Sequence, residues 1–176
     1  PDISVPFGFN RIIAPKNYNS RFFDLLGVKY ILLLNDINSP KYKKVFQEGE
    51  TRIYENTKVF TRAFMAQTVQ TSTDKQTTIN KMFESDLSET AIVEDYTGLD
   101  KFNFGHVQIS KYSPNEIILE TKNEGTGFLV LTDVFYPSWK VEIDGKETKI
   151  YPTDYIFRGV IIPAGSHTVR FFVTLW

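Results

Sequence analysis

The last third of the chain alternates apolar and polar residues in short runs, which turn signals separate at regular intervals. The runs are rich in β-branched and aromatic residues, which favour strands. Asn115, Gly125, Gly145 and Gly165 mark the turns, and the pair Asp144-Gly145 is typical of a two-residue hairpin. We therefore predict a mainly β protein built on an antiparallel, jelly-roll-like β-sandwich. The seven expected strands are 107–112, 116–122, 127–134, 139–143, 148–151, 155–162 and 167–175.

Composition narrows the class of protein. Of the 176 residues, 41% are hydrophobic and 23% are charged, which is ordinary for a soluble globular domain, while 15% aromatic content suits a sandwich core. The formal net charge of −1, without a basic run, argues against nucleic acid or an anionic membrane surface as the main partner. Because the chain contains no cysteine, a disulfide framework and a cysteine-based zinc site are excluded.

The first 70 residues predict one short helix followed by strands. Asn19 or Ser20 can cap a helix whose apolar residues recur at helical spacing, and Gly27 ends it. Residues 28–34 form a nearly continuous apolar run, which predicts a buried strand. A hairpin of residues 42–46 and 52–55 and a strand over 63–70 follow.

Residues 71–105 are more polar. Thr73 and Gln76 match a capping box, and the apolar residues behind them predict a helix over 74–84. A short strand over 91–94 and a loop over 96–105 complete this stretch. We expect three segments in one compact domain: 1–70 packing on the sandwich, 71–105 as helix and connecting loop, and 106–176 as the sandwich core.

The sequence offers no recognisable catalytic or cofactor motif. Neither His106 nor His167 lies beside a nucleophile elbow, and no acidic or histidine spacing is typical of a metal site. Residues 124–127 contain two glycines, but they lead into a strand and are interpreted as a hairpin turn rather than a phosphate loop. We therefore assign no catalytic residue, no metal and no cofactor.

One group of aromatic and charged residues could bind a sugar. Aromatic faces stack on the apolar face of a sugar ring, while carboxylate and guanidinium groups bind its hydroxyls. The alternative is that the aromatic residues belong to the core and that Arg158 pairs with Asp154 or Asp133. The candidate glycan-binding residues are Tyr136, Trp139, Tyr151, Tyr155 and Arg158, with Asp133 and Asp154.

Four blocks, in this order, resemble the C-terminal part of the bacterial YfhO family. They begin with Leu-Leu-Gly-Val-Lys-Tyr-Ile-Leu at 25–32 and continue with Tyr-Glu-Asn at 54–56 and Arg-Ala-Phe at 62–64. The longest block is 128–146, with its Tyr-Pro-Ser-Trp and Asp-Gly-Lys motifs, and the last is 157–169. Ser138 departs from the glycine of the family's Tyr-Pro-Gly-Trp pattern, which suggests that no special backbone angle is essential there.

The resemblance implies a soluble extracytoplasmic domain on the bacterial cell membrane. Proteins of this family are polytopic and look like GT-C glycosyltransferases that use polyprenyl-phosphate-linked sugars to decorate cell-envelope polymers. Their catalytic acid lies in the membrane region, so no catalytic residue carries over. The expected partners are the parent chain's transmembrane region and a cell-envelope glycan. The resemblance also implies a membrane helix beyond Trp176. The apolar residues 171–176 are consistent with a strand near a bilayer interface and equally with a core strand.

Two functions remain open from the sequence. The domain either orients an acceptor glycan for a membrane glycosyltransferase or is a structural, protein-interaction domain that binds no ligand. An exposed Tyr136 or Trp139 lining a groove would favour the first. A stand-alone hydrolase would need a pair of catalytic carboxylates, and no motif places one.

Overall fold

The computed structural model describes residues 3–4 and 14–173, and its chain divides into two compact units, Pro1–Phe60 and Thr61–Trp176. Both are mainly β, as predicted, and the two helices among the described residues are short and lie in the N-terminal half. The boundary between the units lies ten residues before the expected end of the first segment. The end of the last expected strand, Thr174 to Leu175, and Trp176 lie outside the described residues.

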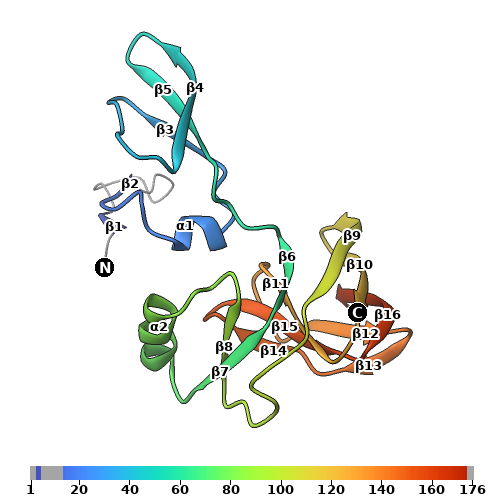
Figure 1. Ribbon diagram of the computed structural model, residues 1–176. Coiled ribbons are helices and arrows are strands. Elements are labelled where there is room, and N and C mark those ends of the chain that lie inside the picture. Colours follow the sequence, from blue (N-terminus) through green and yellow to red (C-terminus); the bar gives the residue numbers. More distant parts are fainter. Residues whose placement is uncertain (1–2, 5–13, 174–176) are drawn as a thin grey trace. The chain divides into compact units, whose positions relative to one another are not determined.

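The first unit contains a short helix and a three-stranded sheet (Figure 1). The expected cap by Asn19 or Ser20 is wrong, because the N-cap of the helix is Arg21, without a capping hydrogen bond from its side chain. Gly27 follows the helix as expected, with a φ of 71°. The sheet has the order β3-β5-β4, and all its pairs are antiparallel. The elements are β1 Ile3–Ser4, β2 Ala14–Pro15, α1 Phe22–Leu25, β3 Tyr30–Leu33, β4 Tyr42–Glu48 and β5 Thr51–Asn56.

The prediction that residues 28–34 form a buried strand is wrong for half of its side chains. Ile31 packs with Tyr42 and Tyr54 in a small core, whereas Tyr30 and Leu32 are exposed. Successive side chains of a strand point to opposite faces, and among the described residues of this unit only one face of the sheet is covered. An apolar run therefore did not distinguish a strand buried on two faces from one buried on a single face.

The second unit contains two sheets that form the sandwich (Figure 1). One is five-stranded, in the order β13-β12-β16-β10-β9, and the other is six-stranded, in the order β6-β11-β15-β14-β8-β7. The strands of the first sheet are β9 Gly105–Ser113, β10 Glu116–Asn123, β12 Trp139–Ile143, β13 Lys146–Thr148 and β16 Gly165–Val173. Those of the second are β6 Ala63–Ala66, β7 Thr68–Ser72, β8 Thr90–Glu94, β11 Gly127–Leu131, β14 Tyr151–Thr153 and β15 Phe157–Ile162.

The main core lies between the two sheets, and a second apolar cluster covers the other face of the six-stranded sheet. Leu129 of β11 belongs to the first cluster together with Phe171 of β16, whereas Phe128 belongs to the second with Tyr96 and Phe102 of the loop after β8. Every residue of β11 is buried. The six-stranded sheet is thus the middle layer, which explains why β11 is a continuous apolar run.

Three sequence interpretations are corrected by the strand pairing. The expected strand 148–151 is two strands, since Lys149 and Ile150 carry the chain from β13 in one sheet to β14 in the other. The expected strand 63–70 is likewise β6 and β7, which lie at opposite edges of one sheet. Residues 124–127 connect β10 to β11 across the sandwich and do not form a hairpin. Each error arose because a local residue pattern does not reveal where the chain leaves one sheet or which sheet the next strand joins.

The Asp144-Gly145 hairpin is confirmed. It joins β12 to β13, and its two residues have φ values of 51° and 78°, as a type I′ turn requires. Ser138 has no positive φ, so serine in place of glycine carries no backbone strain. Trp139, Val141 and Ile143 of β12 all face the main core.

Helix α2, Lys75–Glu84, connects two parallel strands, β7 and β8. This is a βαβ unit within a sheet that is otherwise antiparallel. The helix was predicted from its apolar spacing, but its N-cap is Asp74 rather than Thr73. The Asp74 carboxylate accepts a hydrogen bond from the Thr77 backbone N–H at 2.8 Å, and the hydrogen bonds from Thr77 hold the pKa of Asp74 below its usual value.

Candidate functional site

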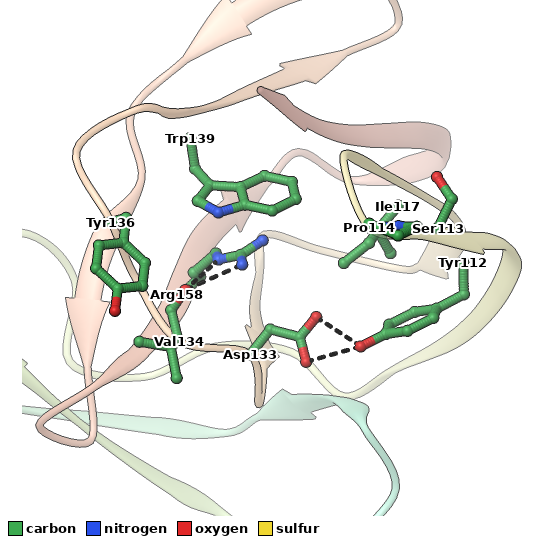
Figure 2. A pocket seen from close by; sticks show the side chains of 9 residues that line it. All are labelled: Tyr112, Ser113, Pro114, Ile117, Asp133, Val134, Tyr136, Trp139 and Arg158. Atoms are coloured by element: carbon green, nitrogen blue, oxygen red, sulfur yellow. Dashed lines mark hydrogen bonds between the residues drawn. The ribbon is translucent and has the colours of Figure 1, made fainter. Parts of the chain in front are cut away.

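A pocket of about 350 Å³ lies at one end of the sandwich (Figure 2). Its walls come from the β9–β10 hairpin, from the loop that crosses between the sheets from β11 to β12, and from the second residue of β15. The lining residues are Tyr112, Ser113, Pro114, Ile117, Asp133, Val134, Tyr136, Trp139 and Arg158.

Backbone hydrogen bonds hold the crossing loop in place. Thr132 N–H donates to the Arg62 carbonyl at 2.9 Å, next to β6, and Phe135 N–H donates to the Ile156 carbonyl at 2.7 Å, before β15. Trp139 N–H closes the turn over Pro137 by donating to the Tyr136 carbonyl at 3.0 Å. Asp133, Tyr136 and Trp139 are therefore presented by a loop that is anchored at both ends.

The negative charge of the Asp133 carboxylate is balanced within the site by an ion pair and a hydrogen bond. Its Oδ1 lies 2.7 Å from Nη1 of Arg62, and the Tyr112 hydroxyl lies 3.1 and 3.2 Å from its two carboxylate oxygens. The Arg62 guanidinium also lies over the Tyr112 ring, with 5.2 Å between guanidinium carbon and ring centre. Burial, followed by the Asp133 charge, raises the pKa of Tyr112, so its hydroxyl stays protonated and donates to the carboxylate.

Arg158 is the charged group of the pocket floor and is only 3% exposed. Its Nε and Nη2 donate to the Val134 carbonyl at 3.1 and 3.0 Å, and its guanidinium carbon lies 3.7 Å from the centre of the Trp139 ring. The remaining nitrogen, Nη1, is buried without a hydrogen-bond partner. Burial lowers the pKa of Arg158 to about 10, which still leaves it charged at neutral pH.

The aromatic residues of the pocket differ in exposure. Tyr136 is 61% exposed and Tyr112 is 54% exposed, and Figure 2 shows them at opposite sides of the pocket with Arg158 and Asp133 between them. Trp139 packs partly into the main core, and Arg158 covers one face of its ring. Stacking area for a ligand is therefore offered mainly by Tyr136 and by the part of the Tyr112 ring that Arg62 leaves uncovered.

The structure brings together four of the seven residues that the sequence suggested, namely Tyr136, Trp139, Arg158 and Asp133. Tyr151 does not line the pocket, because it pairs with Gly159 while Arg158 pairs with Pro152. Neighbouring residues of a strand face opposite ways, so Tyr151 instead contacts the rings of Tyr96 and Phe128, at centroid distances of 5.5 and 6.2 Å.

Asp154 and Tyr155 also lie away from the pocket lining, in the tight turn between β14 and β15, with φ values of 48° and 73°. The Tyr155 ring lies under the ammonium group of Lys75, 4.8 Å from its centre. Asp154 is 1% exposed; its Oδ1 accepts the Ile92 N–H at 2.8 Å, and its Oδ2 has no partner. Burial raises the pKa of Asp154 to about 7. Arg158 forms an ion pair with neither Asp154 nor Asp133, contrary to the alternative considered from the sequence, although the nearby Asp133 charge favours the charged form of Arg158.

Five lining residues were not found from the sequence. The sequence around these residues indicated only an ordinary turn, for example through Pro114 beside Asn115, and gave no sign of a binding site. The closeness of the hairpin to Asp133 depends on contacts between distant residues, such as the hydrogen bond from the Tyr112 hydroxyl to the Asp133 carboxylate across 21 positions. The missed residues are Tyr112, Ser113, Pro114, Ile117 and Val134.

Comparison with protein-family models, with curated protein sequences and with solved structures returned no match. The YfhO resemblance therefore stays a prediction. Across residues 3–4 and 14–173, no three or more acidic, histidine or cysteine side chains gather as a metal site would require. In the same ranges, no helix is both long and apolar enough to cross a bilayer.

Proposed function

We propose that the pocket binds a carbohydrate and that the chain is a non-catalytic, extracytoplasmic domain that orients an acceptor glycan. The observation that carries the proposal is the exposed ring of Tyr136 at a concave site that also holds Tyr112, Asp133 and Arg158. Aromatic rings with a polar edge and a few fixed charged groups are suited to a sugar, which has one apolar face and many hydroxyls.

The size of the pocket agrees with a small ligand. Its volume of about 350 Å³ lies near the lower end of the range of roughly 300–1,000 Å³ for ligand pockets. It is open rather than enclosed, since both tyrosines are more than half exposed. An open pocket of this size suits one or two sugar units of a longer polymer.

The wider biological role rests on the sequence resemblance. We propose that the parent protein is a polytopic membrane protein of the YfhO type, similar to glycosyltransferases that use lipid-linked sugars. In that setting, a binding domain outside the membrane would hold a cell-envelope glycan near the membrane-embedded active site. The domain would also bind the transmembrane region of its own chain.

A structural role without a ligand is the second candidate, and Trp139 favours it. Its ring packs partly into the main core and lies against the guanidinium of Arg158. These contacts stabilise the domain whether or not a sugar binds, so a protein-interaction domain would have the same core. Only the exposed tyrosines distinguish the two functions.

The test is binding of the 176-residue chain to a glycan array, followed by calorimetric titration of the best ligand. Tyr136→Ala should weaken binding by about fivefold, because stacking on one aromatic ring contributes roughly 1 kcal/mol. Tyr30→Ala is the matched control, since Tyr30 is as exposed but belongs to the first unit.

Circular dichroism should show that both variants keep the wild-type fold. If no glycan on the array binds, or if Tyr136→Ala binds as tightly as the wild type, the carbohydrate proposal fails. The structural function would then be the better description.

A further inference from the structure

The pocket holds a buried positive charge that no carboxylate of the described residues neutralises by an ion pair. Arg158 is almost fully buried, and its hydrogen bonds go to a neutral carbonyl group, that of Val134. Nη1 has no partner, and Figure 2 shows it pointing away from Val134, beneath the indole of Trp139. Burying an arginine without a counter-ion is unfavourable unless another group compensates its charge.

Asp133, the acidic residue that lines the pocket, is already compensated. Its carboxylate binds Arg62 at 2.7 Å and accepts a hydrogen bond from Tyr112. The site thus contains two arginine charges and one aspartate charge, which leaves one net positive charge. A neutral sugar would leave that charge uncompensated, whereas a singly charged anionic group would balance it.

We propose that the saccharide bound here is an acidic one, whose single negative charge lies over Arg158. This inference rests on the proposed carbohydrate function and names its ligand class. The ring would stack on Tyr136, and the anionic group would extend toward the pocket floor. Direct contact with Nη1 is unnecessary, because attraction between opposite charges acts over several ångströms where water is partly excluded.

Two kinds of sugar share this chemistry: a uronic acid, with its carboxylate, and a sugar carrying a phosphodiester. The array should therefore contain matched sets in which only the acidic group differs. Suitable sets are glucose, glucuronate and the methyl phosphodiester of glucose 6-phosphate, with the equivalent three compounds for galactose. The acidic member that binds most tightly identifies the source of the charge.

We expect at least one acidic member to bind about tenfold or more tightly than its neutral counterpart, since the attraction between its charge and that of Arg158 adds to the binding free energy. This preference should decrease as salt is raised from 50 to 500 mM, because salt screens the attraction.

Arg62→Ala is the principal variant, because the Arg62 side chain is half exposed and its removal should leave the fold intact. It removes one positive charge beside the pocket, so the preference for the acidic sugar should fall to about twofold or less. Arg158→Gln should abolish the preference as well, provided that circular dichroism shows a folded chain. Lys122→Ala is the charge-matched control: Lys122 is exposed and lies toward the other end of β10 from Ile117.

The outcomes separate this inference from the proposed function. If neutral and acidic members bind equally well, the acidic-sugar inference is overturned while carbohydrate binding stands. If no glycan binds, both fail. A preference that Lys122→Ala reduces as much as Arg62→Ala would also overturn the inference, because the effect would then come from overall charge rather than from the pocket.

Discussion

Arg158 and Asp154 are ionisable residues of the β14–β15 hairpin, and burial affects their charge states differently. Arg158 is buried but remains charged, with a carbonyl and an aromatic ring as neighbours. Asp154 is buried with one carboxylate oxygen bound to a backbone N–H and the other without a partner. For such a carboxyl group, neutrality is the less costly state, so burial raises the pKa of Asp154 to about 7.

Asp154 makes stability depend on pH. Its ordinary pKa is 3.8 and its pKa in the folded chain is about 7, so between these values the folded state binds more protons than the unfolded state. The contribution of Asp154 to stability is complete below about pH 4 and is lost as pH rises to 7. Asp154→Asn should remove this loss. As pH rises from 4 to 7, the unfolding free energy of the variant should therefore increase relative to that of the wild type, by up to about 4 kcal/mol.

Urea denaturation at pH 4 to 8 measures this difference. Asparagine keeps the acceptor for Ile92 and tolerates the positive φ of this turn. The control is Asp95→Asn, since Asp95 also has a positive φ, of 50°, but is exposed. A pH profile of Asp154→Asn parallel to that of the wild type would contradict the assignment of a buried, protonated carboxyl group.

At the scale of elements, the close approach of three strands depends on Gly159. A Cβ atom at this position of β15 would lie 2.5 Å from the Phe128 ring of β11 and would also clash with the Thr153 hydroxyl of β14. These distances are far below van der Waals contact, and the Phe128 side chain is fully buried, so it has little room to move. The glycine is thus required by packing between strands rather than by its own backbone angle.

Gly159→Ala should therefore destabilise the second unit by about 2–3 kcal/mol, the usual effect of overpacking a core. The measurement is the urea midpoint of the variant, with circular dichroism to verify that it folds. In the double variant Phe128→Leu with Gly159→Ala, the loss should be smaller than the sum of the two single losses, because leucine relieves the clash. Additive losses would show that the alanine acts elsewhere.

At the scale of the whole molecule, the second unit contains its own two apolar clusters. All residues of both clusters, from Ala63 to Phe171, belong to residues 61–176. Strand β6, which begins at Ala63, pairs with the buried strand β11 along four residues. A complete core and a covered edge for β11 are the conditions for independent folding.

We expect the fragment 61–176 to fold alone, with a dispersed ¹H–¹⁵N spectrum and one cooperative urea transition. A fragment that starts at residue 71, the boundary expected from the sequence, lacks β6 and most of β7. It should aggregate or unfold, since the edge of β11 is then exposed. Equal behaviour of the two fragments would contradict the boundary at residue 61.

The candidate site shows why prediction from sequence was partial. Tyr136, Trp139 and Asp133 lie within seven residues of one another, so their proximity was visible in the sequence. Asp154 and Arg158 are even closer to each other along the chain, yet only Arg158 lines the pocket. A positive φ at Asp154 redirects its side chain toward Ile92, and no residue pattern indicated that turn.

The sequence by itself determined the mainly β class, the Asp144-Gly145 hairpin and the helix at 75–84, because each follows from side-chain periodicity or local backbone preference. Only the tertiary structure decided which strands share a sheet, where residues 148–151 cross between sheets, and which partner Arg158 finds. These depend on contacts between residues far apart in the chain, and such contacts are selected by burial of the whole core rather than by any local pattern.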